Sequence, residues 1–265
     1  MMYPARLLRL VLPLGIACVL GCSEDMPQIC IPDNLKTVTD SIALEYNSSG
    51  KLETIYYYFF ELHRKDELDY DDTGRLVKIK RKEVSGSNET TVETGELIYD
   101  SKGLPEELQT WGMNTSLPPR LTRFLHDSDG RLLEREIILT RENILYRYEY
   151  DGGNNVTRIY YTNPGSAEVL GRENLSFDTH DKFYAGLREL EILNVYGFGA
   201  EPSRNNPLSS IIYWDGPSIK FPEPVPVTYD LLYNERGLII HSIRVSDSGQ
   251  QIKEFTFYGV NYSCR

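Results

Sequence analysis

A turn pattern that recurs along the chain limits its fold more than any other feature of the sequence. Its clearest copy is Tyr70-Asp71-Asp72-Thr73-Gly74-Arg75-Leu76, in which an aromatic residue and Asp are followed by two polar residues, Gly and, two positions later, an apolar residue. Asp can bond its own backbone and Gly accepts a positive φ, so this combination reverses the chain. The flanking Tyr and Leu suit half-buried strands. The segment 68–79 is therefore predicted to be a β-hairpin.

Seven copies of the pattern are spaced by 24 to 29 residues, with a final interval of 56 that corresponds to two periods. Units of about 20 to 50 residues that each form one supersecondary element stack on their neighbours. We therefore expect an all-β domain over 39–265, in which tandem antiparallel β-hairpin repeats form a curved single sheet or roll. The aromatic positions are Tyr46, Tyr70, Tyr99, His126, Tyr150, Phe177 and Tyr233. The turn residues, for which we expect structural roles, are Gly50, Asp71, Gly74, Asp100, Gly103, Asp127, Gly130, Asp151, Asn154 and Gly237.

The N-terminal segment 1–21 is predicted to be a lipoprotein signal peptide. Two Arg residues precede an apolar run at 10–20, which is shorter than the roughly 20 residues that a spanning helix needs. The run ends in Val19-Leu20-Gly21-Cys22, which resembles a bacterial lipobox and implies that Cys22 is lipidated. An ordinary secretory signal with an incidental Cys is the alternative. Residues 22–38 are expected to form a tether between the lipid and the domain.

Ser23-Glu24-Asp25 resembles the acidic surface-export signal of lipoproteins in the Bacteroides group. The resemblance favours the cell surface over the periplasmic face, although an acidic linker beside an anchor has the same composition. The expected location is therefore the cell envelope, with the N-terminal lipid in the outer membrane.

The cysteines fit an exported protein. Cys18 would leave with the signal peptide and Cys22 would carry the lipid, so Cys30 and Cys264 remain. A disulfide between them would close a loop of more than 200 residues. On the loop-entropy account such a bond stabilises by about 4 to 5 kcal/mol. Two buried free thiols are the alternative.

The interval 184–226 departs most from the repeat and is the first candidate for an insertion added for function. Leu187, Leu190 and Leu193 have helical spacing, which predicts a short helix near 185–195. A hairpin is expected over 211–221. Pro222, Pro224 and Pro226 then suggest an extended connector.

The motif Tyr70 to Leu76 resembles the YD repeat of Rhs-type proteins, whose tandem units build a wound β-sheet. Seven units are too few for the closed shell of those larger proteins, so their encapsulating role is not expected here. The chain is also similar to small YD-like lipoproteins of the Bacteroides group, which combine a lipobox with such repeats. The stretch from Phe177 to Tyr184 resembles their late repeat but lacks its Asn-Pro. The resemblance implies a fold and a location.

Several function classes are disfavoured. The net charge of −11 argues against nucleic acid as a partner, because phosphate neutralisation needs concentrated Lys and Arg. No His or Cys pair has ligand spacing, so we expect no metal and no cofactor. Asp127-Ser128-Asp129-Gly130 begins like a calcium loop, but Arg131 and Leu139 replace the later ligands, and a turn is expected. There is no Gly-x-Ser-x-Gly nucleophile motif.

Aromatic side chains leave two interpretations open. The runs at 56–60 and 146–150 place rings on both faces of their strands. If one face is open, the rings could stack on sugars or grip a peptide, and otherwise they form core. The candidate ligand-binding residues are Tyr58, Tyr148, Tyr160 and Trp214.

The leading hypothesis is therefore a non-catalytic, lipid-anchored envelope module that binds a glycan or a protein. A purely structural envelope component is one alternative. A glycoside hydrolase is another, and it would require two carboxylates about 5 to 10 Å apart in a cleft.

Overall fold

The computed structural model describes residues 30–37, 40–59, 62–113, 116–139, 143–182, 187–193, 202–214, 220–246 and 257–264. The expected signal peptide, the lipidation of Cys22 and the acidic export signal lie outside the described residues. The described residues form sixteen strands and one short helix. The elements are β1 (Cys30–Thr37), β2 (Asp40–Tyr46), β3 (Leu52–Phe59), β4 (Leu62–Tyr70), β5 (Leu76–Ser85), β6 (Asn88–Tyr99), β7 (Pro105–Gly112), β8 (Arg120–His126), β9 (Leu132–Ile138), β10 (Asn143–Tyr150), β11 (Val156–Thr162), β12 (Val169–Asp181), α1 (Arg188–Ile192), β13 (Asn205–Trp214), β14 (Lys220–Tyr233), β15 (Ile239–Ser246) and β16 (Phe257–Cys264).

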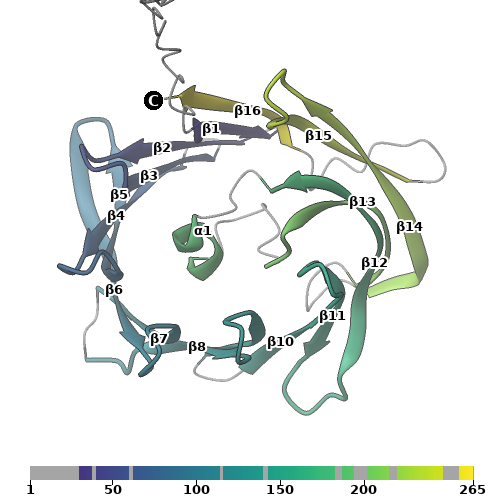
Figure 1. The fold of residues 1–265 in the computed structure, drawn as a ribbon. Coiled ribbons are helices and arrows are strands. Elements are labelled where there is room, and N and C mark those ends of the chain that lie inside the picture. Colours follow the sequence, from purple (N-terminus) through teal and green to yellow (C-terminus); the bar gives the residue numbers. More distant parts are fainter. Residues whose placement is uncertain are drawn as a thin grey trace, which may run out of the picture.

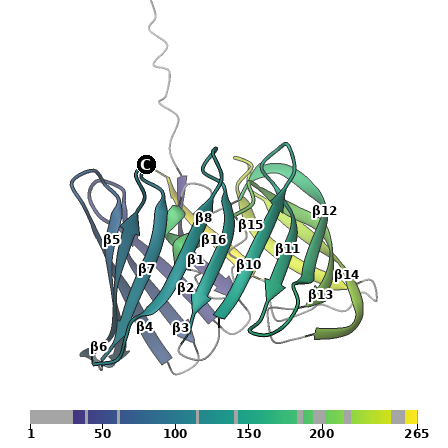
Figure 2. The same ribbon diagram turned by 90° about the horizontal axis from the view of Figure 1, so that it is seen from below.

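Each strand pairs antiparallel with its neighbours in the sequence, and β16 pairs with β1, so the sheet closes into a barrel (Figure 1). The strands are tilted against the barrel axis (Figure 2). The all-β, tandem-hairpin prediction is confirmed. Closure goes further than the curved single sheet or roll that the sequence suggested.

The repeated turns share one geometry. The backbone N–H of Asp71 donates to the carbonyl of Arg75 at 2.9 Å. Oδ1 of Asp71 accepts from the N–H groups of Thr73 at 3.0 Å and Arg75 at 2.9 Å. Gly74 has φ +86°. The same positive φ occurs at Gly50, Gly103, Gly130, Gly237 and, as the one non-Gly case in the described chain, Asn154 at +66°. Asn is the next-best residue for this conformation after Gly.

In the sixth predicted copy, at 177–183, the described residues 177–182 do not form a hairpin turn. Strand β12 runs on to Asp181, and Oδ1 of Asp178 accepts from the N–H of Asn206 in β13 at 3.0 Å. Asp181 stands where the other copies have Gly or Asn. Asp181 adopts positive φ less readily than Gly, and the strand continues through this position, while Oδ1 of Asp178 accepts from the N–H of His180 at 3.2 Å as well as from the neighbouring strand.

The repeat tyrosines connect successive repeats. The hydroxyl of Tyr99 donates to the carbonyl of Leu76 at 2.6 Å, and that of Tyr150 to the carbonyl of Leu132 at 2.7 Å. Tyr46, Tyr70 and Tyr262 make the corresponding bonds to Pro32, Leu52 and Ile239. Each accepting carbonyl lies in a strand of another hairpin, so the hydroxyl joins repeats across the inside of the barrel end.

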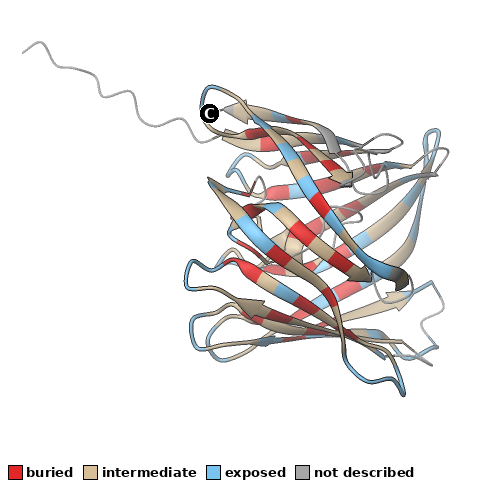
Figure 3. Cartoon of the chain, turned by 90° about the vertical axis from the view of Figure 1, so that its right-hand side faces the viewer, coloured by how far each residue is buried: buried red, intermediate tan, exposed pale blue. Residues whose placement is uncertain are grey.

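The helix α1 lies inside the barrel (Figure 1), which confirms the short helix predicted near 185–195. Its Leu190 and Ile192 belong to the hydrophobic core that the inward strand residues form. Buried and exposed residues alternate along the strands, as Figure 3 shows. Within the described residues, no helix is long and apolar enough to cross a membrane.

Two expectations about connecting segments are wrong. The tether predicted at 22–38 does not hold for 30–37, because these residues form β1, which pairs with both β16 and β2. The proline-bearing connector is part of β14, where Pro226 lies opposite Ile211 of β13. Prolines at alternate positions remove donors from one edge of a strand only. The interval 184–226 therefore supplies barrel strands as well as α1.

Candidate functional site

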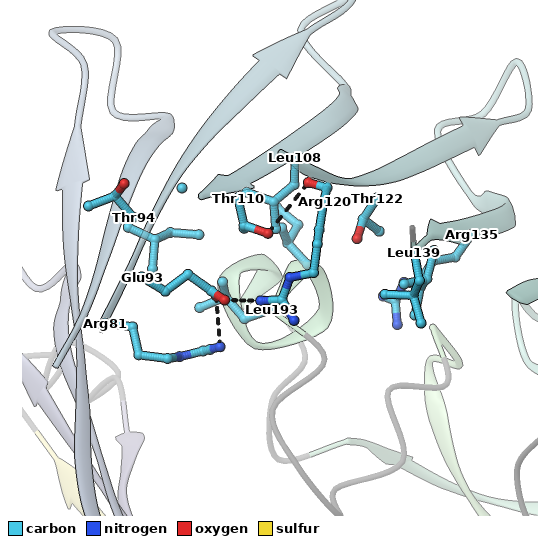
Figure 4. A pocket seen from close by; sticks show the side chains of 14 residues that line it. Arg81, Glu93, Thr94, Leu108, Thr110, Arg120, Thr122, Arg135, Leu139 and Leu193 are labelled. Carbon is cyan, nitrogen blue, oxygen red and sulfur yellow. Dashed lines mark hydrogen bonds and ion pairs between the residues drawn. The ribbon is translucent and has the colours of Figure 1, made fainter. Parts of the chain in front are cut away.

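A cavity of about 320 Å³ lies inside the barrel, between the inner wall of β5 to β9 and the end of α1 (Figure 4). Strand alternation explains how its wall is built, since every second residue points inward. Ile79, Leu108, Ile137 and Leu139 give it apolar surface, and Leu193 closes it from the helix side. The wall combines apolar surface with a few polar side chains, which is the usual composition of a small-molecule site.

A charged network forms one side of the cavity. Asp66 has 0 % exposure and accepts two bonds of 2.8 Å from Arg81 and one of 3.0 Å from the hydroxyl of Tyr57. Arg81 also donates to Glu93 at 3.0 Å, and Glu93 in turn accepts from Arg120. Burial and the Asp66 carboxylate raise the pKa of Tyr57 well above its ordinary value. The network runs from the core to Arg120, whose side chain is 53 % exposed.

Arg135 stands on the other side of the cavity and is 2 % exposed. Its guanidinium donates to the backbone carbonyl of Glu191 in α1, and its Nε has no hydrogen-bond partner. The guanidinium carbon is 5.8 Å from the ring centre of Phe124. Within the described part of the chain, no carboxylate oxygen lies within 4 Å of this guanidinium. Arg135 therefore differs from Arg81, which has two carboxylate partners.

Glu191 is the acidic residue of α1 that interacts with Arg135. Burial raises the pKa of the Glu191 carboxyl, while Arg135, Arg188 and Lys182 oppose that shift. The helix is also held by its other acid, because Oε1 of Glu189 accepts from the hydroxyl of Tyr70 at 3.2 Å. The two contacts fix α1 against two different strands of the wall, β4 and β9.

The four predicted ligand-binding residues do not form one site. Tyr148 is 5 % exposed and belongs to the core, where burial raises its pKa. Tyr58 is 40 % exposed and stacks on Tyr56 at a centroid distance of 6.4 Å. Tyr160 lies under the guanidinium of Arg147, 4.0 Å from its ring centre. The side chain of Trp214 lies outside the described residues. Strands β3 and β11 are on opposite sides of the barrel (Figure 1), so Tyr58 and Tyr160 are far apart.

The outer wall carries cross-strand ion pairs. Lys65 contacts Glu67 at 3.0 Å and Glu89 at 2.6 Å. Arg147 contacts Glu149 at 2.8 Å and Glu168 at 2.7 Å. Similar pairs on the same face join Lys82 to Glu67, Arg123 to Glu107, and Arg158 to Glu173. A shallow depression of about 610 Å³ on this wall is lined by exposed Ile98 and Leu125 among such charges. The described outer wall is thus polar over many strands.

Sequence reasoning missed Asp66, Arg81, Glu93 and Arg135. A signal for Asp66 was present, because it shares strand parity with Leu68 and so belongs to the buried face. In the described residues, no group of three His, Cys, Asp or Glu side chains is placed to hold a metal ion.

Cys30 is disulfide-bonded, and Arg236 donates to its sulfur at 2.9 Å. The register of β1 and β16 places Cys30 opposite Cys264. The bond between these two cysteines stays a prediction of the sequence.

The fold and site together define a closed antiparallel barrel that holds a helix and a cavity in its interior. It is similar to the crystal structure of a porin-like protein from Bacteroides uniformis ATCC 8492, with 16% identity over 91% of this chain and 98% of that chain, and a TM-score of 0.55. This likeness is one of fold. A porin-like protein from Bacteroides vulgatus ATCC 8482 matches with 11% identity over 88% of this chain and 99% of that chain, at a TM-score of 0.38.

The crystal structure of TcdB2-TccC3-Cdc42 matches with 14% identity over 80% of this chain and 12% of that chain, at a TM-score of 0.34. No protein-family model matches the sequence, and no curated protein does.

Proposed function

We propose that this protein is a non-catalytic component of the bacterial cell envelope that binds a small ligand, such as a sugar unit of a glycan, inside its barrel. The internal cavity beside Arg135 is the observation that carries the proposal. A cavity of about 320 Å³ suits one small molecule and is too small for a folded protein partner. The lipobox-like segment at Cys22 supports anchoring by lipid, as in the YD-like lipoproteins that the sequence resembles.

Binding fits the cavity better than catalysis does. Glycoside hydrolysis needs one carboxyl group as acid and another as nucleophile or base. The acidic residues of the cavity network are occupied, because Arg81 and Arg120 engage both oxygens of Glu93, and Asp66 lies behind Arg81. Neither carboxylate is free to act on a substrate.

The polarity of the walls supports a position in water beside the membrane. Barrels that span a bilayer carry an apolar band on the outside, and a Lys or Arg facing lipid at the bilayer midplane costs about 2 to 4 kcal/mol. Here the outer wall carries ion pairs such as Lys65 with Glu89 and Arg147 with Glu168, while the inner wall holds the apolar core. The similarity to a porin-like protein therefore supports the barrel fold, and we do not propose that this barrel forms a pore.

A cavity-filling variant tests the proposal. Thr122→Phe places a ring in the cavity, whereas Thr91→Phe adds the same ring at an exposed position of β6. A panel of mono- and disaccharides is screened by thermal shift, since a ligand of the folded state raises Tm. We expect shifts for the wild type and Thr91→Phe and none for Thr122→Phe. Equal shifts in all three proteins, or no shift with any sugar, would contradict lumenal sugar binding.

A further inference from the structure

We propose that the ligand carries a carboxylate, and that Arg135 binds it. The inference rests on the proposed lumenal binding function and names the chemistry of its ligand. The expected class is a sugar acid the size of one hexuronic acid, held with its carboxylate at Arg135 and its hydroxyl groups toward the opposite side of the cavity.

The first support is the position of the Arg135 charge. Transferring an unpaired charge into a protein interior costs several kcal/mol, so buried guanidinium groups are ordinarily paired with carboxylates. Arg81 follows this rule through Asp66 and Glu93. Arg135 is 2 % exposed and has a carbonyl as its hydrogen-bond partner, with Nε unsatisfied. A carboxylate in the adjoining cavity would supply the acceptor that Nε lacks, and it would bring a direct charge contact that Glu191, which interacts with Arg135 from beyond ion-pair distance, does not provide.

The second support is the geometry of the group. A guanidinium offers a planar set of donors that matches a carboxylate, and such charge-assisted bonds are about twice as strong as neutral ones. The Arg135 side chain is fixed by its bond to α1 and by the Phe124 ring. A fixed donor loses little conformational freedom when it binds.

The third support is the field inside the barrel. The chain as a whole is acidic, with a net charge of −11, yet arginines recur on its inner wall. The register and burial assign to this wall Arg64, Arg81, Arg120, Arg135, Arg172 and Arg244. Asp66 and Glu93 lie on the same wall and pair with Arg81 and Arg120, so among the arginines that line the cavity Arg135 is the one that has no carboxylate contact within the described residues and that favours an anion.

The remaining lining suits the body of a sugar. Figure 4 shows Glu93 and Arg135 on opposite sides of the cavity, with Thr110 and Thr122 between them. The threonine hydroxyls can accept bonds from sugar hydroxyls or donate bonds to them, while Leu108 and Ile137 can contact the apolar ring face. The carboxylate of the ligand would thereby lie away from Glu93, which it would repel.

Calorimetric titration tests the inference with three probes: D-glucuronate, D-glucose and D-glucose 6-phosphate. The proteins are the wild type, Arg135→Gln, Arg135→Lys and Arg123→Gln, which removes an outer-wall arginine on the neighbouring strand β8. We expect the wild type and Arg123→Gln to bind glucuronate at least tenfold more tightly than glucose. Arg135→Gln should abolish this preference, and Arg135→Lys should restore part of it.

The outcomes separate the two proposals. Equal binding of glucuronate and glucose by the wild type overturns the carboxylate assignment and leaves sugar binding intact. A preference that survives in Arg135→Gln overturns the role of Arg135. Binding of D-glucose 6-phosphate but not of D-glucuronate overturns the carboxylate assignment and indicates that the ligand carries a phosphate. Failure of all three probes overturns sugar binding itself. A thermal melt of each variant checks that it is folded. The preference of the wild type for glucuronate over glucose is measured on the unmodified protein, so it does not depend on whether a variant folds.

Discussion

The hydroxyl of Tyr150 donates a hydrogen bond to the backbone carbonyl of Leu132, 2.7 Å away. Tyr150 ends β10 and Leu132 begins β9, so the bond joins one repeat turn to the strand that follows the previous turn. The tyrosine richness of the sequence is thus explained in part by ties between repeats, whose hydroxyls point at backbone and not at a ligand.

Tyr150→Phe should lower the free energy of unfolding by about 0.5 to 1.5 kcal/mol, because it removes one half-buried hydrogen bond and leaves a carbonyl without its donor. Tyr58→Phe is the matched control, since Tyr58 is exposed on the outer wall. Urea unfolding of both variants measures the difference. Equal losses for the two would mean that the tie contributes nothing.

Gly103→Ala should destabilise by about 1 to 2 kcal/mol, the cost of a side chain in the left-handed region. Gly103 has φ +78° and no atom within 4 Å of an added Cβ, so the effect isolates backbone strain. Gly103→Asn should cost less, as Asn154 occupies the same turn position. Gly112→Ala, which also meets no neighbour, is the control and should change stability little. Denaturant unfolding measures these losses. A loss for Gly103→Asn that equals or exceeds the loss for Gly103→Ala would contradict the assignment to backbone strain.

Asp66→Asn should destabilise by about 3 to 5 kcal/mol, because it breaks a buried pair and leaves Arg81 without its main partner. Asp69→Asn changes an exposed carboxylate on the same strand and should have little effect. Denaturant unfolding measures the stability of both variants. If Asp66→Asn does not fold, the yields of soluble protein for the two variants are compared instead. A loss below that of Asp69→Asn would remove Asp66 as the centre of the network.

Glu191 should make the fold less stable as the pH rises. Burial raises its pKa above the ordinary 4.5, so the folded chain retains a proton that the unfolded chain has released. Between the ordinary pKa and the raised pKa of Glu191, the unfolded state binds fewer protons than the folded state, so the free energy of unfolding falls with increasing pH. Glu191→Gln should therefore gain stability over the wild type between pH 4.5 and neutrality. Glu106→Gln, at an exposed position, should show no such gain. Parallel pH curves for wild type and Glu191→Gln would contradict the assignment.

Peptide mapping under non-reducing conditions should find Cys30 joined to Cys264, which lie opposite each other in β1 and β16. Such a bond would close the barrel covalently where the first and last strands meet. Detection of Cys30 joined to another cysteine, or of free Cys264, would reject the pairing.

The repeated turns were predictable because their chemistry is local. Asp71 and Gly74 specify a turn without reference to the rest of the chain, and strand alternation follows from the flanking residues. The stretch at 177–183 was wrongly predicted to be a turn because it has the aromatic residue and the Asp, but it carries Asp181 where the turns carry Gly or Asn. Tyr262 makes the repeat tie without the turn motif, so no local signal marked it.

Closure and the cavity depend on contacts distant in sequence. Residues 30–37 include Pro32, Asp33, Asn34 and Lys36, which are common in tethers, and they form a strand because β16 and β2 pair with them. The cavity arginine Arg135 sits between Glu134 and Glu136 and looks like part of a solvated charged strand. Its burial arises from α1, which enters the barrel from a segment more than 50 residues away. The residues next to Arg135 in the sequence therefore do not predict that α1 packs against it.

A crystal structure of the protein grown with D-glucuronate tests lumenal recognition of an acidic sugar most directly. We expect the sugar in the cavity between Arg135 and Glu93, with a carboxylate oxygen within hydrogen-bond distance of the Arg135 guanidinium. A sugar stacked on Tyr58 or Tyr160 at the outer wall, with none in the cavity, would contradict lumenal recognition.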